Sequence, residues 1–239
     1  MNYHRDRTYL KSENQFRNIF LKRFRIMFRH LAGGVAPAAH PRGGICLEIG
    51  CSNGVFLDLF KEKKYETWGV EPSGSAKVAK RKGHKIINAI FEEAKLPEDY
   101  FDLVIFNHTL EHMDNPVEVL KKVHKILKKD GIVFIDVPNF GSLSSKILGK
   151  RWPYLLPKEH KHQFTKESLT RLLREAGFDI VHWESRSGIF EYADPFLELW
   201  QSLITFKKRF FTDLLTFPYA LVAAFSNMGD SMSFVAKKI

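Results

Sequence analysis

The sequence predicts an α/β fold built on a doubly wound, mostly parallel sheet of seven strands. Between residues 45 and 184, short apolar segments with strand character alternate with amphipathic helical segments. This rhythm is typical of parallel sheets that carry helices on both faces. The chain has 239 residues, 44% of them hydrophobic, which suits one such domain with additional elements. A final segment with strand character, residues 231–238, would complete the sheet.

Each strand is indicated by a run of apolar residues, many of them β-branched or aromatic. The predicted strands are 45–49 (ICLEI), 67–71 (TWGVE), 85–87 (KII), 102–106 (DLVIF), 132–137 (IVFIDV), 178–184 (FDIVHWE) and 231–238 (SMSFVAKK). The helices between them are indicated by caps, terminal glycines and apolar periodicity. They are predicted at about 54–61, at 75–82 before Gly83, at 116–129 between Asn115 and Gly131, and between the Thr165 cap and Gly177.

Helical segments of a different kind flank this core. A helix near residues 14–31 has one apolar side, with Arg25 and Arg29 opposite. Its apolar residues are Phe16, Phe20, Phe24, Met27, Phe28 and Leu31. Residues 190–226 are rich in Phe, Leu and Trp, are punctuated by Pro195 and Pro218, and predict two or three inserted helices. The expected organisation is a basic amphipathic helical cap (1–40), a core (41–189), an apolar helical insertion or lid (190–227) and the last strand (228–239).

The charge of the chain is concentrated near its start. The formal net charge is +10, and residues 1–30 carry eight Lys or Arg against two acidic residues. Such a segment either contacts an anionic partner, such as a membrane surface or nucleic acid, or forms a solvated helix face. The apolar run 214–225 is too short to cross a bilayer, which needs about 20 apolar residues, but it could lie on one. Two cysteines without a disulfide framework, Cys46 and Cys51, indicate a cytoplasmic protein.

A glycine turn follows the first predicted strand. In LEIGCSNG (47–54), Gly50 allows a tight turn, and Gly54 allows a ligand to approach the start of the next helix. Glu71 ends the second strand, at the same carboxyl edge of the sheet. A carboxylate at that position can accept both hydroxyls of a ribose. Together these features predict a nucleoside site, whereas each feature alone would indicate only a tight turn or an exposed strand end.

The turn, with Glu48 before Gly50, resembles motif I of the class I S-adenosylmethionine-dependent methyltransferases, (D/E)-x-G-x-G-x-G, with Ser52 in place of the middle glycine. GVEPS (69–73) resembles motif II. Residues 96–139 and 159–181 resemble the branch that contains ubiquinone-type O-methyltransferases, so the likeness covers about 44–185. It implies a Rossmann-like methyltransferase fold and S-adenosyl-L-methionine as cofactor. The cofactor residues implied are Glu48, Gly50, Cys51, Ser52, Gly54, Glu71, Pro72, Phe91, Glu92, Asn107 and His108. Ile90 stands where the family often has the Asp that binds adenine.

HTLEH (108–112) also matches H-x-x-E-H, the motif of inverted zinc proteases. That motif requires a helix that carries both histidines, but His108 closely follows a strand and Pro116 starts a new helix. We therefore predict no metal ligands here. At the carboxyl end of the fourth strand, Asn107 and His108 would flank the methionine end of the cofactor. Glu111 and His112 would face the methyl acceptor.

Methyl transfer to a hydroxyl requires alignment of the reactants and removal of a proton. The candidate bases are His112, His108 and His160, although each could be a structural histidine. The resemblance implies methylation on oxygen of a small-molecule, glycan or lipid-linked acceptor, with peripheral contact to an anionic membrane as a hypothesis. The alternatives are a nucleic-acid methyltransferase, for which no N/D-P-P-Y/F segment follows the fourth strand, and a non-catalytic cofactor-binding partner subunit. The sequence does not indicate the oligomeric state.

Overall fold

The computed structural model describes residues 13–31, 43–204 and 208–239 and confirms the expected seven-stranded, mostly parallel sheet. The strands are β1 (Ile45–Ile49), β2 (Glu66–Val70), β3 (Lys85–Ile87), β4 (Phe101–Asn107), β5 (Leu127–Pro138), β6 (Phe178–Arg186) and β7 (Ser231–Lys238). Their order is β3-β2-β1-β4-β5-β7-β6, and β7 runs antiparallel to both of its neighbours, β5 and β6. Strands β1 and β4 are adjacent, and the connections that follow them lead toward opposite edges of the sheet. A crevice therefore forms at the carboxyl ends of these two strands.

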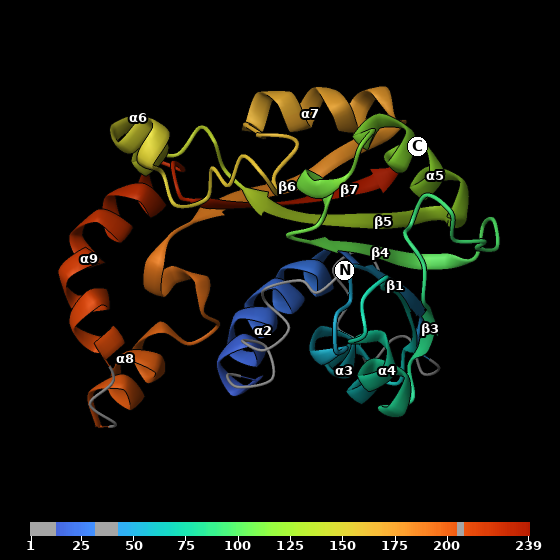
Figure 1. Ribbon diagram of the computed structural model, residues 1–239, viewed down its shortest axis with the longest axis horizontal. Coiled ribbons are helices and arrows are strands. Elements are labelled where there is room, and N and C mark those ends of the chain that lie inside the picture. The colour runs from blue at the N-terminus through green and yellow to red at the C-terminus, as the bar shows by residue number, and fades with distance from the viewer. Residues whose placement is uncertain (1–12, 32–42, 205–207) are drawn as a thin grey trace.

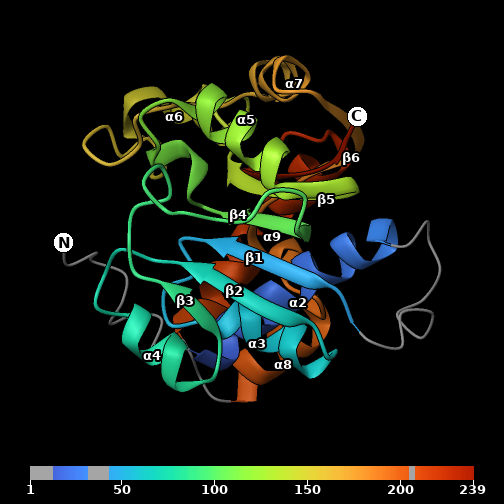
Figure 2. The same ribbon diagram turned by 90° about the vertical axis from the view of Figure 1, so that its right-hand side faces the viewer.

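Helices cover both faces of the sheet (Figure 1 and Figure 2). The α-helices are α2 (Glu13–His30), α3 (Val55–Glu62), α4 (Ala76–Arg81), α5 (Pro116–Ile126), α6 (Leu143–Leu148), α7 (Lys166–Glu175), α8 (Pro195–Ile204) and α9 (Lys208–Phe225). Single 3₁₀ turns are η3 (Leu110–His112), η4 (Gly149–Arg151) and η5 (Gly188–Glu191). In both views α5 and α7 lie on one face of the sheet, and α2, α3 and α4 lie on the other.

Each face of the sheet has its own hydrophobic core. On the α5 and α7 side, buried strand residues such as Phe106 and Val133 pack against Leu120 and Leu169. On the opposite side, Phe134 and Ile105 belong to a cluster that includes residues of α2 and α3. Both faces of the strands are therefore buried, as expected of a parallel sheet covered by crossover helices.

The predicted amphipathic helix at the start of the chain is α2, and its apolar side packs onto the core. Phe20 stacks on Phe56 of α3 with 4.7 Å between ring centroids, and Phe24 meets Phe60 edge-to-face at 4.9 Å. Met27 is fully buried. The exposed residues Arg25 and Arg29 lie on the other side, as the periodicity predicts. Of the basic residues near the start, Arg5, Arg7 and Lys11 lie outside the described residues.

The end of α5 differs from the prediction. The sequence predicts a helix as far as residue 129, but α5 ends at Ile126 and β5 already begins at Leu127. Leu127 is fully buried and pairs with Phe101 of β4. This strand pairing overrides the helix preference of residues 127–129 (LKK). Asp130 then takes a positive φ of 65° at an irregularity of the β4–β5 ladder.

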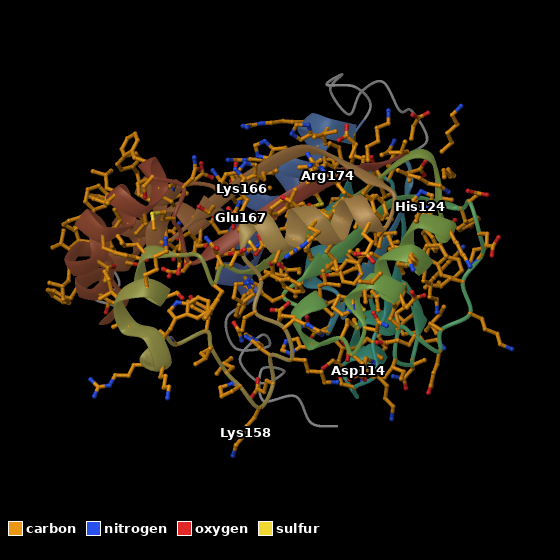
Figure 3. All side chains as sticks on the ribbon, turned by 90° about the horizontal axis from the view of Figure 1, so that it is seen from above. Asp114, His124, Lys158, Lys166, Glu167 and Arg174 are labelled. Carbon is orange, nitrogen blue, oxygen red and sulfur yellow. The ribbon has the colours of Figure 1, made fainter. Side chains whose placement is uncertain are left out.

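The cap of α7 uses an uncommon residue. Thr165 accepts a hydrogen bond from the backbone of Ser168, and the Ser168 hydroxyl accepts one from the backbone N–H of Thr165. This is a capping box in which serine replaces the usual glutamate. Lys166, Glu167 and Arg174 mark the polar surface of this helix (Figure 3).

The segment before β7 forms η5, α8 and α9, in agreement with the expected inserted helices. Pro218, expected to break a helix, lies inside α9, so it does not separate two elements. Figure 1 shows α8 and α9 beyond the end of the sheet at which the parallel strands finish. Helix α6 is an element that the sequence did not predict. Among the described residues, we find no helix with the length and apolarity needed to cross a membrane.

Candidate functional site

The glycine turn between β1 and α3 has the conformation that its sequence predicts. Gly50 and Gly54 take positive φ angles of 74° and 79°, and Ser52 also has a positive φ of 46°. A Cβ atom on Gly50 would lie 2.8 Å from the side chain of Thr109, so glycine is required there for space as well as for backbone conformation. The left-handed Gly54 is the N-cap of α3.

The carboxylate of Glu71, just after β2, is tied to this turn. Its Oε2 accepts a hydrogen bond of 2.9 Å from the Ser52 amide, and its Oε1 accepts one of 2.8 Å from the Ser73 amide. Each oxygen keeps a second lone pair for a ligand. Glu71 is 6% exposed, whereas its neighbour Pro72 is exposed. The predicted acid therefore does lie beside the glycine turn.

A pocket lies at the carboxyl ends of β1 and β4 and contains five of the predicted cofactor residues. It is lined by Glu48, Gly50, Cys51, Ser52, Asn53, Val55, Phe56, Asn107 and, from α2, Phe20. Three buried polar atoms of these residues have no hydrogen-bond partner among the described residues: Glu48 Oε2, Asn53 Nδ2 and Asn107 Oδ1. Buried polar groups are rarely left unpaired, so these atoms fit a polar ligand. Burial, with the charges of Glu71 and Asp58, raises the pKa of Glu48 well above its usual value.

The segment after β3 carries two further predicted cofactor residues, Phe91 and Glu92. Phe91 is buried and meets Phe106 edge-to-face, with 6.3 Å between ring centroids, while Glu92 is exposed. The Lys122 ammonium donates to the backbone carbonyls of both residues, at 2.7 Å and 3.0 Å. Those carbonyls are therefore already engaged by an intramolecular donor. Asn88 links this segment to the end of β2 through a 2.6 Å hydrogen bond to the Glu71 carbonyl.

His108 lies in a buried group of charges at the carboxyl ends of β4 and β5. Its Nε2 is 3.2 Å from Asp136 Oδ1, and its Nδ1 is 3.5 Å from Glu111 Oε1. Burial by itself lowers the pKa of His108, but these two carboxylates outweigh burial and raise the pKa to about 9. A protonated imidazole cannot accept a proton, so this geometry argues against His108 as a general base at neutral pH.

Asp136 is the centre of this group, which the sequence did not predict. It is fully buried and accepts hydrogen bonds from Arg23 of α2 at 2.8 Å and from Arg186 of β6 at 2.6 Å, while the Ser231 and Ser233 hydroxyls also donate to it. Burial alone would raise the pKa of Asp136, but Arg23 and the other cations hold it well below its usual value. The one feature of the sequence that could have indicated this group is an aspartate inside the apolar run IVFIDVP.

The structure brings His112 and His160 together. Their ring centroids are 4.9 Å apart, and Oε1 of Glu111, also in η3, lies 4.0 Å from His160 Nε2. The side chain of His112 is half-buried, while Glu111 and His160 are buried. His162 does not join them, because its Nε2 lies 3.3 Å from the Asp114 carbonyl. Figure 3 labels Asp114, which follows η3, and Lys158, in the loop that carries His160.

The zinc-protease interpretation of HTLEH does not fit this geometry. Residues 110–112 form one 3₁₀ turn, and His108 precedes it with a positive φ of 53°. The two histidines of the motif therefore do not project from successive turns of one helix, as that class of enzyme requires.

The sheet order, the glycine turn and the acid at the neighbouring strand end define a Rossmann-like nucleoside-binding protein. Residues 23–183 match the family model described as a methyltransferase domain. The chain therefore belongs to this family, within the class I S-adenosylmethionine-dependent methyltransferases, and S-adenosyl-L-methionine is its cofactor.

Relatives of the chain agree with this membership. It is 30% identical over 163 residues to an uncharacterized protein of Methanocaldococcus jannaschii. This match covers 65% of this chain and 73% of that protein. It is 26% identical over 167 residues to the ubiquinone biosynthesis O-methyltransferase of a Bradyrhizobium species, and the match spans 64% of each chain. A crystal structure of a methyltransferase from Archaeoglobus fulgidus shares the fold, with a TM-score of 0.63, 21% identity and coverage of 97% and 99%.

Proposed function

We propose that this protein transfers the methyl group of S-adenosylmethionine to a hydroxyl oxygen of a small-molecule or lipid-linked acceptor. The observation that carries the proposal is that residues 107–112 connect two sites. Asn107 lines the pocket at the glycine turn, and Glu111 and His112 form a cluster with His160. Similarity to ubiquinone biosynthesis O-methyltransferases supports oxygen as the atom that is methylated.

The residues of the pocket suit the parts of the cofactor. Glu71 offers a carboxylate for the ribose hydroxyls, and the unpaired Glu48 Oε2 and Asn107 Oδ1 are acceptors for the ammonium group of the methionine moiety. The bound cofactor supplies an activated methyl group on a sulfonium. Because such a group is intrinsically reactive, the protein contributes mainly by aligning the acceptor and by excluding water. Phe20 of α2 covers one side of the pocket and helps to exclude water from it.

The acceptor hydroxyl must also lose its proton. We assign this step to the cluster of Glu111, His112 and His160. Of its two imidazoles, that of His112 is the more exposed and lies within reach of a ligand from solvent. His108, held protonated by Asp136 and Glu111, instead contributes positive charge between the pocket and the cluster.

A lipid-linked acceptor is favoured by the surface of α8 and α9, which we name the apolar insertion surface. Its large apolar side chains are unusually exposed, from 37% at Leu221 to 84% at Phe225. They are Phe196, Leu197, Trp200, Leu203, Ile204, Phe211, Leu214, Leu215, Leu221, Val222 and Phe225. Soluble monomers rarely expose so many neighbouring apolar groups without a binding role. The surface lies beyond the carboxyl ends of the strands, on the ligand side of the sheet (Figure 1).

The activity is tested by calorimetry with S-adenosylhomocysteine, followed by transfer of a tritiated methyl group to a panel of catechols, polyprenyl phenols and sugars. We expect binding heat and a labelled ether product. Binding without any product across the panel would favour a cofactor-binding partner subunit. Strong, salt-sensitive methylation of RNA or DNA would favour a nucleic-acid methyltransferase instead.

The membrane hypothesis is tested by sedimentation with vesicles of phosphatidylcholine and phosphatidylglycerol. We expect the protein to sediment with vesicles and the double variant Phe196→Ser/Trp200→Ser to stay in the supernatant. These residues lie one turn apart on α8. Val181→Ser, at an exposed apolar residue of β6, is the matched control and should sediment like the unchanged protein. Equal recovery of the unchanged protein in the supernatant with and without vesicles would exclude this surface as a membrane contact.

A further inference from the structure

Three potential metal ligands converge beside the cofactor pocket. Glu111 and His112 come from η3, and His160 comes from the loop between η4 and α7. One ligand atom from each residue lies within 4.8 Å of the other two. Side chains separated by almost 50 residues in the sequence thus meet at one point.

Both imidazoles are held in the same way by the backbone. Nδ1 of His112 donates a 2.8 Å hydrogen bond to the Glu159 carbonyl, and Nδ1 of His160 donates a 2.8 Å hydrogen bond to the Tyr154 carbonyl. With the proton on Nδ1, the neutral ring presents an Nε2 lone pair. A metal-ligating histidine is commonly fixed by such a second bond, which sets both tautomer and orientation.

The buried carboxylate of Glu111 is only partly compensated by its ion-pair neighbour His108. The residue is 1% exposed, and neither carboxylate oxygen has a hydrogen-bond partner among the described residues. Two imidazole nitrogens lie within 4.0 Å of Oε1, His108 Nδ1 at 3.5 Å and His160 Nε2 at 4.0 Å. Buried carboxylates are normally hydrogen-bonded to cations or coordinate metals. Because His108 is shared with Asp136, a metal ion at the centre of this cluster would complete the pairing of Glu111.

We propose that Glu111, His112 and His160 bind a divalent transition-metal ion of the Zn²⁺ or Mn²⁺ class. Two imidazole nitrogens and one carboxylate oxygen are a ligand set that suits ions of this class. Ligands about 2.0–2.1 Å from a tetrahedral ion lie roughly 3.3 Å from each other, so the ion would draw the 4.0 Å pair together by less than about 1 Å. Side-chain rotation accommodates such a movement.

This site differs from the zinc-protease motif that HTLEH matches. In that motif His108 and His112 would be the pair, whereas here His160 takes the place of His108. His108 turns toward Asp136 and belongs to the buried group of charges. The sequence predicted no metal ligands because HTLEH does not lie on one helix, and the proposal revises that prediction with His160, from a distant segment.

Three protein ligands leave coordination positions open, as in catalytic rather than structural sites. A role of the ion in catalysis rests on the proposed methyl transfer. In that reaction, an open coordination position takes the acceptor oxygen. Coordination lowers the pKa of a bound hydroxyl, so its proton is released to water near neutral pH. The oxygen then forms the new bond to the methyl carbon, while the carbon–sulfur bond breaks and leaves its electron pair on sulfur. His112 would act as a ligand, and no free imidazole base is needed.

Metal binding is tested with the full chain, without an affinity tag, after treatment with a chelator. Calorimetric titration with Zn²⁺ and with Mn²⁺ should show one site per chain for at least one of them. Co²⁺ should produce visible absorption bands typical of nitrogen ligation. Glu111→Gln and His160→Gln should each weaken binding at least about tenfold. His162→Asn, in the same loop but outside the cluster, is the matched control and should bind like the unchanged protein.

The result does not depend on methyl transfer, because the titration contains neither methyl donor nor acceptor. Absence of binding by the unchanged protein, or equal affinity in Glu111→Gln, would overturn the proposal while leaving the proposed function intact. Since Glu111 is buried, circular dichroism must show that its variant is folded. If it is not, the half-buried His112→Asn replaces it in the titration. Conversely, metal binding without any methylated product would count against the proposed function alone.

Discussion

Nη2 of Arg23 lies 2.8 Å from Oδ1 of Asp136, and this buried ion pair joins helix α2 to the carboxyl end of β5. Both side chains are almost completely buried. Because Phe20, on the same helix, lines the pocket at the glycine turn, the ion pair also positions one wall of that pocket. The cap at the start of the chain is therefore part of the site as well as a cover for the core.

Replacing Arg23 with methionine should destabilise the fold strongly. It would leave Asp136 as a buried charge with one cation fewer, a change that typically costs about 3–5 kcal/mol. Urea denaturation at neutral pH measures the free energy of unfolding. Arg25→Met is the control, because Arg25 forms an exposed pair with Asp194 at 3.5 Å and should change stability by at most about 1 kcal/mol. Equal effects of the two substitutions would contradict the role of the buried pair.

Glu71→Ala should weaken the binding of S-adenosylhomocysteine by about 1–3 kcal/mol, the range for losing hydrogen bonds to a charged group. The substitution removes the carboxylate that we propose binds the ribose, and it also frees the Ser52 and Ser73 amides. Calorimetry measures the affinity. Glu66→Ala, at the other end of β2, should retain it. Full affinity in Glu71→Ala would remove this carboxylate from the cofactor site.

Gly50→Ala should reduce cofactor affinity by more than about tenfold. The new methyl group would lie 2.8 Å from Thr109, at a φ of 74° that costs an L-residue about 1–2 kcal/mol. Gly74→Ala provides the comparison, because a Cβ atom there would meet nothing within 4 Å. We expect its affinity and melting temperature to match those of the unchanged protein. A tolerated Gly50→Ala would show that the turn is less constrained than its geometry indicates.

Glu184 should contribute stability that depends on pH. Burial by itself raises the pKa of Glu184, but His182 and Arg186 outweigh burial and lower it to about 2. Because the unfolded chain has the higher pKa, near 4.5, the carboxylate stabilises the fold above that pH. This contribution is lost as the pH falls from about 4.5 toward 2.

Glu184→Gln should therefore lower the free energy of unfolding by about 2 kcal/mol at pH 7 and by less at pH 3. Urea denaturation at the two pH values measures the difference. Glu118→Gln, at an exposed residue of α5, should have little effect at either pH. A penalty for Glu184→Gln that is equal at pH 7 and pH 3 would contradict the linkage.

His112→Ala should spare cofactor affinity and reduce turnover by about 10²–10⁴-fold, the usual contribution of proton transfer. The prediction holds whether the imidazole acts as a base or as a ligand, because both roles remove the proton from the acceptor. Calorimetry with S-adenosylhomocysteine and a single-turnover methyl-transfer assay separate the two quantities. Unchanged turnover would exclude His112 from the reaction.

The sequence by itself determined the sheet, the glycine turn with its acid, and the amphipathic α2, because local periodicity and turn chemistry encode them. It could not predict the end of α5, where pairing of Leu127 with Phe101 outweighs helix preference. Nor could it predict that Arg23 meets Asp136, or that His160 meets Glu111 and His112. These groups are far apart along the chain, and their meeting depends on how α2 and the loop before α7 pack. Only the tertiary structure decides such contacts, since burial and charge pairing act through space.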